Sequence, residues 1–142
     1  MNSDFVVAVH ALVYLKHKKA KISSEELAKN VCTNSARIRK VMSKLNKAEL
    51  ISTKEGTEGG YLYNENLEDI SLLTVSQALS TKFVDLKWRS GNHSLECLIS
   101  SGMADIFDDI VLSLDNVCKE KLSQLSIANI EKKIFKENEN GI

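Results

Sequence analysis

Apolar residues recur at intervals of three and four along most of the chain, a spacing typical of helices with one buried face. The first such run follows Ser3 and Asp4, either of which can cap a helix, and ends at about residue 18. Its apolar positions are Phe5, Val6, Val9, Leu12 and Val13. Because this stripe is broad, we expect the helix to be buried on two sides, by the domain's own core and by something else.

Two shorter helices are predicted next, on either side of a tight turn. Ser23 and Glu26 form a capping box that starts a helix ending at about residue 31. Either Thr33 or Asn34 can cap a third helix that ends at about residue 48. The apolar face of this third helix comprises Ile38, Val41, Met42, Leu45 and Ala48. Two helices joined by a turn of three or four residues indicate a helix-turn-helix.

A β-hairpin is predicted directly after these helices. Residues 50–54 and 61–63 have strand character, and the glycine-rich residues 55–60 form the turn between them. Gly59 and Gly60 allow close backbone approach, so the tip of this hairpin wing can lie along a phosphate backbone or in a minor groove. The alternative is a phosphate-binding loop of an enzyme, but no following helix starts with Lys-Ser or Lys-Thr.

The rest of the chain is predicted to hold three helices and a loop. Ser71 caps a short helix that ends at about residue 79, and residues 81–94 form an irregular loop. A long helix then covers about residues 101–125, and a final helix follows it. The stripe of the long helix requires a partner helix and comprises Ile99, Met103, Ile106, Ile110, Leu114, Val117 and Leu125. We therefore predict a mainly α fold with a small β-hairpin wing: a winged helix-turn-helix DNA-binding domain over residues 1–80, and a loop, a dimerisation helix and a C-terminal helix over residues 81–142.

Charge is divided unevenly along the chain, although its 142 residues carry 19 Lys or Arg and 19 Asp or Glu. Residues 1–64 contain eleven basic and six acidic side chains, a net charge of +5, and residues 65–142 contain eight and thirteen, a net charge of −5. Phosphate binding needs a local basic surface rather than a basic protein, so the first half is predicted to face an anion. Chance clustering of solvated charges is the alternative.

The third predicted helix concentrates these basic residues opposite its apolar face. Between Arg37 and Lys47 there is no acidic residue, whereas a solvated helix face usually mixes both signs. Recognition helices meet bases with their N-terminal turns. We therefore predict that Ser35, Arg39, Lys40 and Ser43 face a DNA groove, that Arg37, Lys44 and Lys47 lie nearer phosphates, and that Gly59 and Gly60 contact DNA from the wing.

Other patterns exclude several classes of protein. Three cysteines at wide spacing fit neither a secreted disulfide framework nor a zinc site, so we expect a cytoplasmic protein without a bound metal. No apolar run reaches the 18 or so residues of a membrane span, so no membrane partner is expected. Without a nucleophile elbow or paired carboxylates in an obvious pocket, nothing indicates an enzyme.

Taken together, these elements resemble the Rrf2 family of bacterial winged-helix transcription regulators over most of the chain. The resemblance is carried by residues 7–12, 24–31, 33–34, 39–41, 45–48 and 56–61. It implies a homodimer that pairs through the long helix after the wing and places two recognition helices in successive major grooves of a palindromic operator. Glu49 replaces the small residue that usually ends the recognition helix, and Glu55 replaces the usual basic residue before the wing glycines, so we expect weaker wing contacts.

Iron-sulfur members of that family carry three closely spaced cysteines in the loop before the dimer helix. This chain has only Cys97 in that region, so the resemblance implies no cofactor held in the family's way. The alternative is a cluster assembled from Cys97 with Cys32 and Cys118 across a dimer.

Cysteine oxidation is the signal that we predict for a repressor of this kind. Cys32 directly precedes the basic third helix, where the helix dipole favours a thiolate, and Cys97 of the partner subunit is predicted to resolve it as a disulfide. Cys118 is expected in the core. Two alternatives remain: a regulator controlled by a small ligand or partner protein, with inert cysteines, and a winged-helix interaction module that does not bind DNA.

Overall fold

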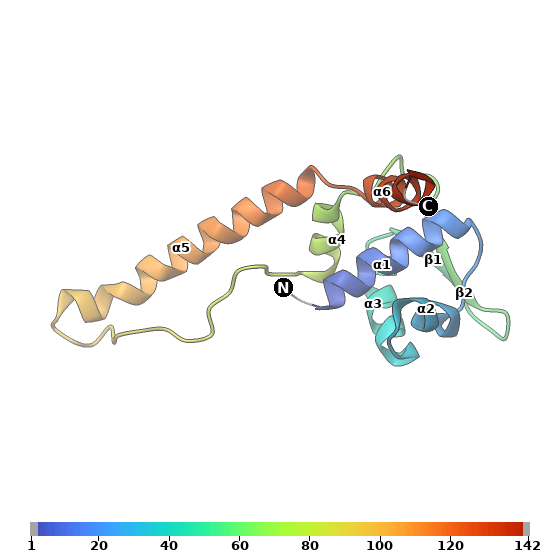
Figure 1. Cartoon of the computed structure of the whole chain (residues 1–142). Helices are drawn as coiled ribbons and strands as arrows, with labels where there is room; N and C mark the ends of the chain where they lie inside the picture. The colour runs from blue at the N-terminus through green and yellow to red at the C-terminus, as the bar shows by residue number, and fades with distance from the viewer. Residues whose placement is uncertain (1–2, 141–142) are drawn as a thin grey trace.

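The computed structural model describes residues 3–140 of the chain, with side chains for residues 3–136. Within that range, helices make up most of the structure and two strands form one antiparallel hairpin (Figure 1). The elements are α1 (Ser3–Lys18), α2 (Ser24–Val31), α3 (Ser35–Lys47), β1 (Ile51–Lys54), β2 (Gly60–Tyr63), α4 (Leu72–Leu79), α5 (Leu98–Ser123) and α6 (Ile127–Asn140). The predicted mainly helical fold with a hairpin wing is confirmed.

Polar side chains set the starts of three helices, as predicted. The Oγ atom of Ser23 accepts a hydrogen bond from the amide of Glu26 at 3.1 Å, and this starts α2. The caps of α3 and α4 are Asn34 and Ser71. The side chain of each accepts a hydrogen bond from the backbone amide three residues further along the chain. The expected cap of α1 is wrong, because Ser3 and Asp4 already lie within that helix.

The core lies where α1 meets α2, α3, α4 and α6, and we call this part the body. Its largest fully buried side chains include Leu12, Leu27, Ile38 and Met42. Burial of α1 on two sides follows from these neighbours, but the predicted stripe is wrong at Val6, which is exposed. On α3, the predicted face is buried from Ile38 to Leu45, whereas Ala48 is exposed. The body therefore closes its own hydrophobic core.

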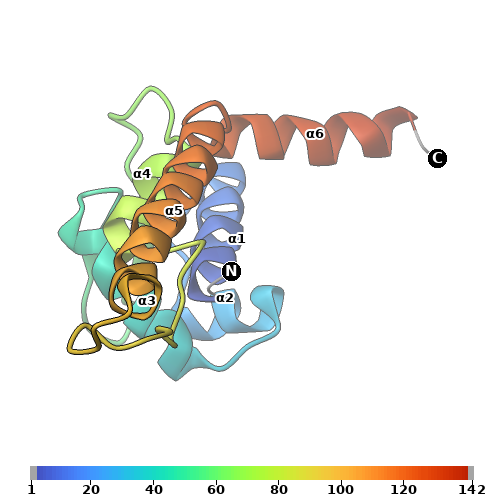
Figure 2. The same ribbon diagram turned by 90° about the vertical axis from the view of Figure 1, so that its left-hand side faces the viewer.

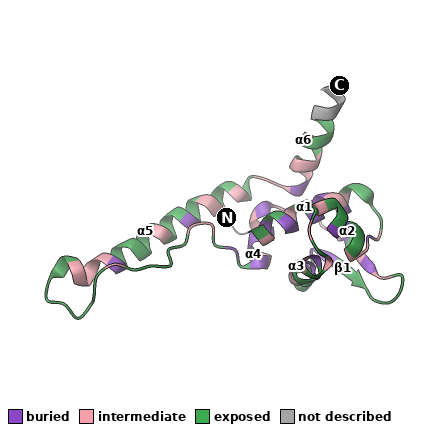
Figure 3. Cartoon of the chain, turned by 60° about the horizontal axis from the view of Figure 1, so that its bottom comes forward, coloured by how far each residue is buried: buried purple, intermediate pink, exposed green. Residues whose placement is uncertain are grey.

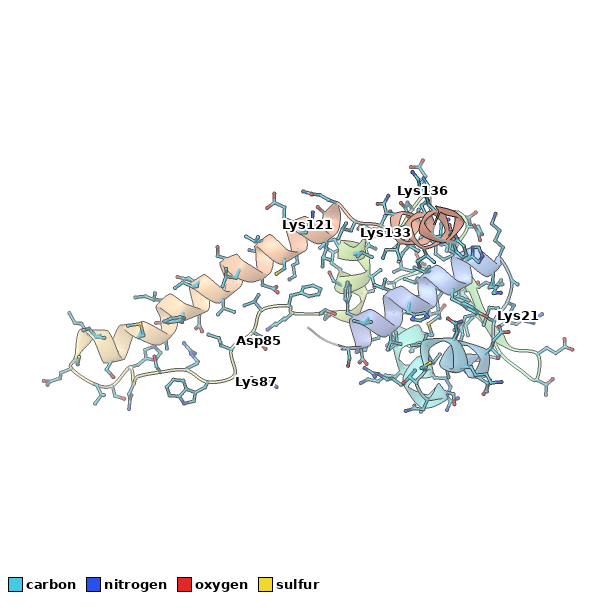
Figure 4. The ribbon with its side chains drawn as sticks, viewed as in Figure 1. Lys21, Asp85, Lys87, Lys121, Lys133 and Lys136 are labelled. Carbon is cyan, nitrogen blue, oxygen red and sulfur yellow. The ribbon has the colours of Figure 1, made fainter. Side chains whose placement is uncertain are left out.

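The wing is anchored to the body at its base. Its register runs from Ile51 opposite Tyr63 to Lys54 opposite Gly60. The backbone of Tyr61 also exchanges two hydrogen bonds with Ile22, at 2.8 and 3.0 Å, so the α1–α2 connection lies beside β2; Lys21 of that connection is labelled in Figure 4. These bonds fix the direction in which the hairpin leaves the body.

Residues 81–97 lead away from the body, and α5 then runs back toward it alongside this loop (Figure 1). The carboxylate of Asp115, only 4% exposed, accepts hydrogen bonds from the amides of Phe83 and Val84 at 2.7 and 3.1 Å and pairs with Lys119 at 3.0 Å. The loop beyond this point carries Asp85 and Lys87 along the helix (Figure 4). Asp115 thus fastens the start of the loop to α5.

Helix α6 returns to the body after α5 ends, crossing the end of α1 (Figure 2). Ile127 is fully buried in the body, Lys16 of α1 pairs with Glu131 at 3.0 Å, and the rings of His17 and Phe135 stack at 3.9 Å. The division of the chain at residue 80 stays a prediction. None of the helices in residues 3–140 has the length and apolar character that crossing a membrane would require.

Candidate nucleic-acid interface

The turn between α2 and α3 orients the candidate recognition helix. Cys32 ends α2 in the left-handed conformation, with φ of 64° and ψ of 51°, and the next amide, that of Thr33, donates to the carbonyl of Ala28 at 3.0 Å. Only three residues, Cys32, Thr33 and Asn34, separate the two helices. Because the apolar face of α3 is fully buried from Ile38 to Leu45, its opposite face must point to solvent.

That outward face is basic and carries no acid within α3. Arg39, Lys40, Ser43 and Lys47 are exposed, whereas Ser35, Arg37 and Lys44 are half-buried. The helix thus brings all seven predicted side chains onto one element, and its exposed members share one side. Their contacts with DNA remain a prediction.

The wing contacts α3 through strand β1. Burial raises the pKa of the Tyr61 hydroxyl on β2, and the nearby positive charge of Arg39 opposes that rise. The wing requires glycine at positions 59 and 60 for a structural reason in addition to the predicted contact with DNA. A Cβ at Gly59 would lie 2.5 Å from the carbonyl oxygen of Lys54, and a Cβ at Gly60 would lie 2.7 Å from the carbonyl oxygen of Ile22. Lys54, exposed at the end of β1, is a basic residue that the sequence-based prediction omitted.

The sequence-based prediction also missed an acid from another element, Asp4 of α1. Its Oδ1 atom accepts a hydrogen bond from Nε of Arg37 at 3.0 Å, and its Oδ2 atom lies 3.5 Å from Nζ of Lys40. Arg37 also donates to the hydroxyl of Ser3. The separation of 33 positions between Asp4 and Arg37 leaves no signal of this pair in the local sequence pattern.

The cysteine environments differ from the expected ones. Cys32 and Cys97 are exposed and Cys118, expected in the core, is half-buried. The thiol of Cys32 sits at the end of α2 and donates to the carbonyl of Lys29 at 3.7 Å, while the start of α3 is capped by Asn34 instead. Cys97 occupies the N-terminal cap of α5, where the amides of Ser100 and Ile99 lower the pKa of its thiol. The helix N-terminus expected beside Cys32 is therefore found at Cys97.

The two candidate redox residues lie on distant parts of one chain. Cys32 joins α2 to α3 in the body, whereas Cys97 precedes the start of α5, the end of that helix farthest from the body (Figure 1). A disulfide between them within this conformation of one chain is excluded by that separation. A bond between two subunits stays a prediction.

A winged helix with an exposed basic recognition face defines a class, the DNA-binding winged-helix transcription regulators. The chain belongs to the Rrf2 family, described as iron-dependent transcriptional regulators, whose model matches residues 1–133. It is 28% identical over 135 residues to YwnA of Bacillus subtilis (strain 168), named as an HTH-type transcriptional regulator, and the match covers 95% of this chain and 99% of that protein.

Solved structures share the fold. A crystal structure described as a transcriptional regulator from Lactobacillus plantarum aligns with a TM-score of 0.79 and 22% identity, over all of both chains. CymR, the global cysteine regulator of B. subtilis, aligns with a TM-score of 0.64 and 15% identity, covering 94% of this chain and 96% of that one. The transcription-regulator class and the winged-helix fold expected from the sequence are thus confirmed.

The iron named in the family description does not fit the residues of this chain. Among the side chains that the structure describes, those of residues 3–136, no three His, Cys, Asp or Glu side chains gather closely enough to hold a metal ion. Cys97 stands at the start of α5, apart from Cys32 at the C-terminal cap of α2 and from Cys118 within α5. Cluster ligation normally requires several thiolates converging on one site, so we derive no step through iron.

Proposed function

We propose that this protein is a homodimeric, cytoplasmic repressor that inserts α3 of each subunit into the major groove of a palindromic operator. The observation that carries this proposal is the exposed, acid-free basic face of α3 beside the wing. Arg39 is exposed on this face and can donate two hydrogen bonds to the O6 and N7 atoms of one guanine. Ser35, Lys40 and Ser43 line the same groove, and Arg37, Lys44, Lys47 and the wing glycines Gly59 and Gly60 lie nearer phosphates.

The dimer rests on the apolar surface of α5. Within the described residues, only Ala104 and Asp115 of this helix are buried, although apolar residues recur along it. Ile106, Ile110 and Val117 are 57%, 42% and 61% exposed. Monomers rarely leave so large an apolar surface in water, and a two-fold interface would cover the same face on both copies.

Operator binding is tested with duplex DNA from the region upstream of the protein's own gene, titrated with salt. Arg39→Ala should weaken operator binding by about 1–3 kcal/mol and relax sequence preference. Lys44→Ala should weaken binding to all sequences alike, and Lys132→Ala on α6 serves as a control. Equal affinity of the wild-type protein for operator and random DNA across the titration would refute the proposal and favour an interaction module.

A second proposal concerns regulation: a peroxide oxidises Cys97, and the partner subunit's Cys32 resolves it. Exposure of both thiols and the lowered pKa of Cys97 support this order, which reverses the roles expected from the sequence. The Cys97 thiolate attacks one peroxide oxygen, breaking the O–O bond and leaving a sulfenic acid. The second thiol then forms the S–S bond and releases water. With hydrogen peroxide, two thiols are oxidised and one peroxide becomes two waters.

Oxidation should produce a covalent dimer on a non-reducing gel, reversed by dithiothreitol, with altered operator affinity. Both Cys32→Ser and Cys97→Ser should abolish this dimer, and Cys118→Ser should retain it. If the oxidised wild-type protein runs as a monomer and binds operator as the reduced protein does, the thiol mechanism is wrong. Control by a small ligand or partner protein then becomes the better hypothesis.

A further inference from the structure

The basic charge of α3 is partly neutralised by one acid from α1. Within α3 itself, five basic side chains and no acidic one occur: Arg37, Arg39, Lys40, Lys44 and Lys47. Among the described residues, the ion pairs that involve α3 all go to Asp4. The two oxygens of this carboxylate divide between two cations, with Oδ1 on Arg37 and Oδ2 on Lys40.

The exposure of these side chains makes the contact relevant to an incoming phosphate. The side chain of Asp4 is 17% exposed, whereas those of Arg37 and Lys40 are 32% and 65% exposed. Both cations therefore remain reachable from solvent while the carboxylate beneath them is mostly covered. They lie within the first two turns of α3, the part of a recognition helix that approaches the groove first.

Asp4 stays ionised at neutral pH. Burial alone would raise the pKa of its carboxyl, but the hydrogen bond from Arg37 and the positive charges of Lys40 and Arg37 outweigh burial and hold this pKa below its usual value. The negative charge against α3 is therefore permanent under the conditions in which the protein meets DNA.

We propose that Asp4 restrains Arg37, which we place nearer phosphates, and Lys40, which we place in the groove, and so limits the phosphate contacts that both cations can make in nonspecific complexes with DNA of any sequence. Asp4 is then a positioning residue, since it acts through two side chains of the recognition helix. The proposal rests on the function proposed above, in which α3 contacts DNA. Nonspecific binding consists almost entirely of phosphate contacts, so an acid that competes with phosphate for two cations weakens it most directly. Arg39 and Ser43 lie outside this contact and keep their exposed positions for base edges.

Asp4→Asn tests the proposal, because it removes the charge while keeping a side-chain oxygen that accepts from Arg37. Fluorescence anisotropy with a random-sequence duplex measures affinity against salt. We expect Asp4→Asn to bind about fivefold more tightly near 0.15 M salt, with the slope of log K against log salt steeper by about 0.9, as for one additional neutralised phosphate. Asp4→Glu retains the charge and should stay near wild type. Glu120→Gln, which removes an exposed acid of α5, is the matched control.

A second pair of variants separates this role from a purely structural tether between α1 and α3. Arg37→Gln should change the salt slope little in the wild-type protein, where Asp4 already engages Arg37, and should remove most of the gain in the Asp4→Asn protein. A tether would instead make Asp4→Asn bind DNA more weakly and melt at a lower temperature. Unchanged or weaker binding to random DNA by a folded Asp4→Asn protein overturns the inference.

The two proposals can fail separately. If the wild-type protein prefers its operator and Arg39→Ala loses that preference, yet Asp4→Asn leaves the salt slope unchanged, only the role of Asp4 is wrong. If the wild-type protein shows no salt-dependent DNA binding at all, the proposed function fails and the role of Asp4 fails with it.

Discussion

The body and α5 carry similar patterns of apolar residues, but these residues are buried in the body and exposed on α5. Apolar residues recur at helical spacing on α1 and α3, and their side chains, such as those of Leu12 and Val41, are fully buried within one chain. They recur in the same way on α5, yet Ile106 and Ile110 face solvent there, and Figure 3 shows this helix mostly exposed or half-buried. Helical periodicity therefore identifies an apolar face without identifying what covers it.

This difference assigns different tasks to the two regions. The body has a closed core and presents α3, so its stability should depend on packing within one chain. Helix α5 meets the body near its end and is fastened to the loop by Asp115, so most of its apolar surface requires a second chain in our proposal. Substitutions in the body should therefore lower the stability of each chain, whereas substitutions on the apolar face of α5 should disrupt the dimer.

The largest effect is expected from a charge in the stripe of α5. Ile110→Lys should prevent dimer formation, because an unpaired charge buried in an interface costs about 3–5 kcal/mol. Light scattering should report a monomer or insoluble protein. Asn116→Lys, at an exposed polar position on the same helix, should remain dimeric. A soluble, folded Ile110→Lys dimer would move the interface away from this stripe.

A core truncation in the body should act on stability within each chain. Leu12→Ala removes a fully buried side chain of α1 and should lower the free energy of unfolding by about 2–5 kcal/mol, measured by urea denaturation. Val6→Ala, at an exposed position of the same helix, should cost far less. Similar losses from both substitutions would mean that the exposed face of α1 is covered by another chain.

Acid should loosen the connection between the loop and α5. Burial would raise the pKa of the Asp115 carboxyl, but bonds from Lys119, Val84 and Phe83 outweigh it and hold this pKa below its usual value. The folded state therefore gains stability from the ionised carboxylate above about pH 4, the unfolded value, and loses that gain as pH falls through the lower folded pKa.

Asp115→Asn should cost about 1–3 kcal/mol at neutral pH and flatten the dependence of stability on pH below 4. Thermal denaturation at several pH values measures both effects. Asp85→Asn, at an exposed position in the same loop, serves as the control and should keep the wild-type pH dependence. An unchanged acid dependence in Asp115→Asn would show that other carboxyls control acid unfolding.

The smallest effect is expected at a helix cap of the body. Ser23→Ala removes the acceptor for the amide of Glu26 and should lower the free energy of unfolding by about 1 kcal/mol, without changing the oligomeric state. Ser24→Ala, one residue later and within α2, should change it by less than about 0.5 kcal/mol. Equal effects of the two substitutions would argue against the cap.

Local features were predictable from the chain because their interactions span few residues. The caps Ser23, Asn34 and Ser71 each bond an amide three positions away, so their residue types and spacing are visible in the sequence. The hairpin likewise pairs neighbouring segments, and its glycine-rich turn marks it. The basic face of α3 was predictable too, since helical geometry and the apolar positions of the same helix determine its direction.

Contacts between distant segments were decided only by the tertiary structure. Asp4 meets Arg37 because α1 packs against α3, and Asp115 meets residues 83–84 because α5 runs back along the loop. The positions of Cys32 and Cys97 depend in the same way on where α2 ends and α5 begins. Sequence periodicity determines which faces of these helices are apolar or charged, whereas packing between segments determines which of those faces meet, because only packing brings groups far apart in the chain within bonding distance.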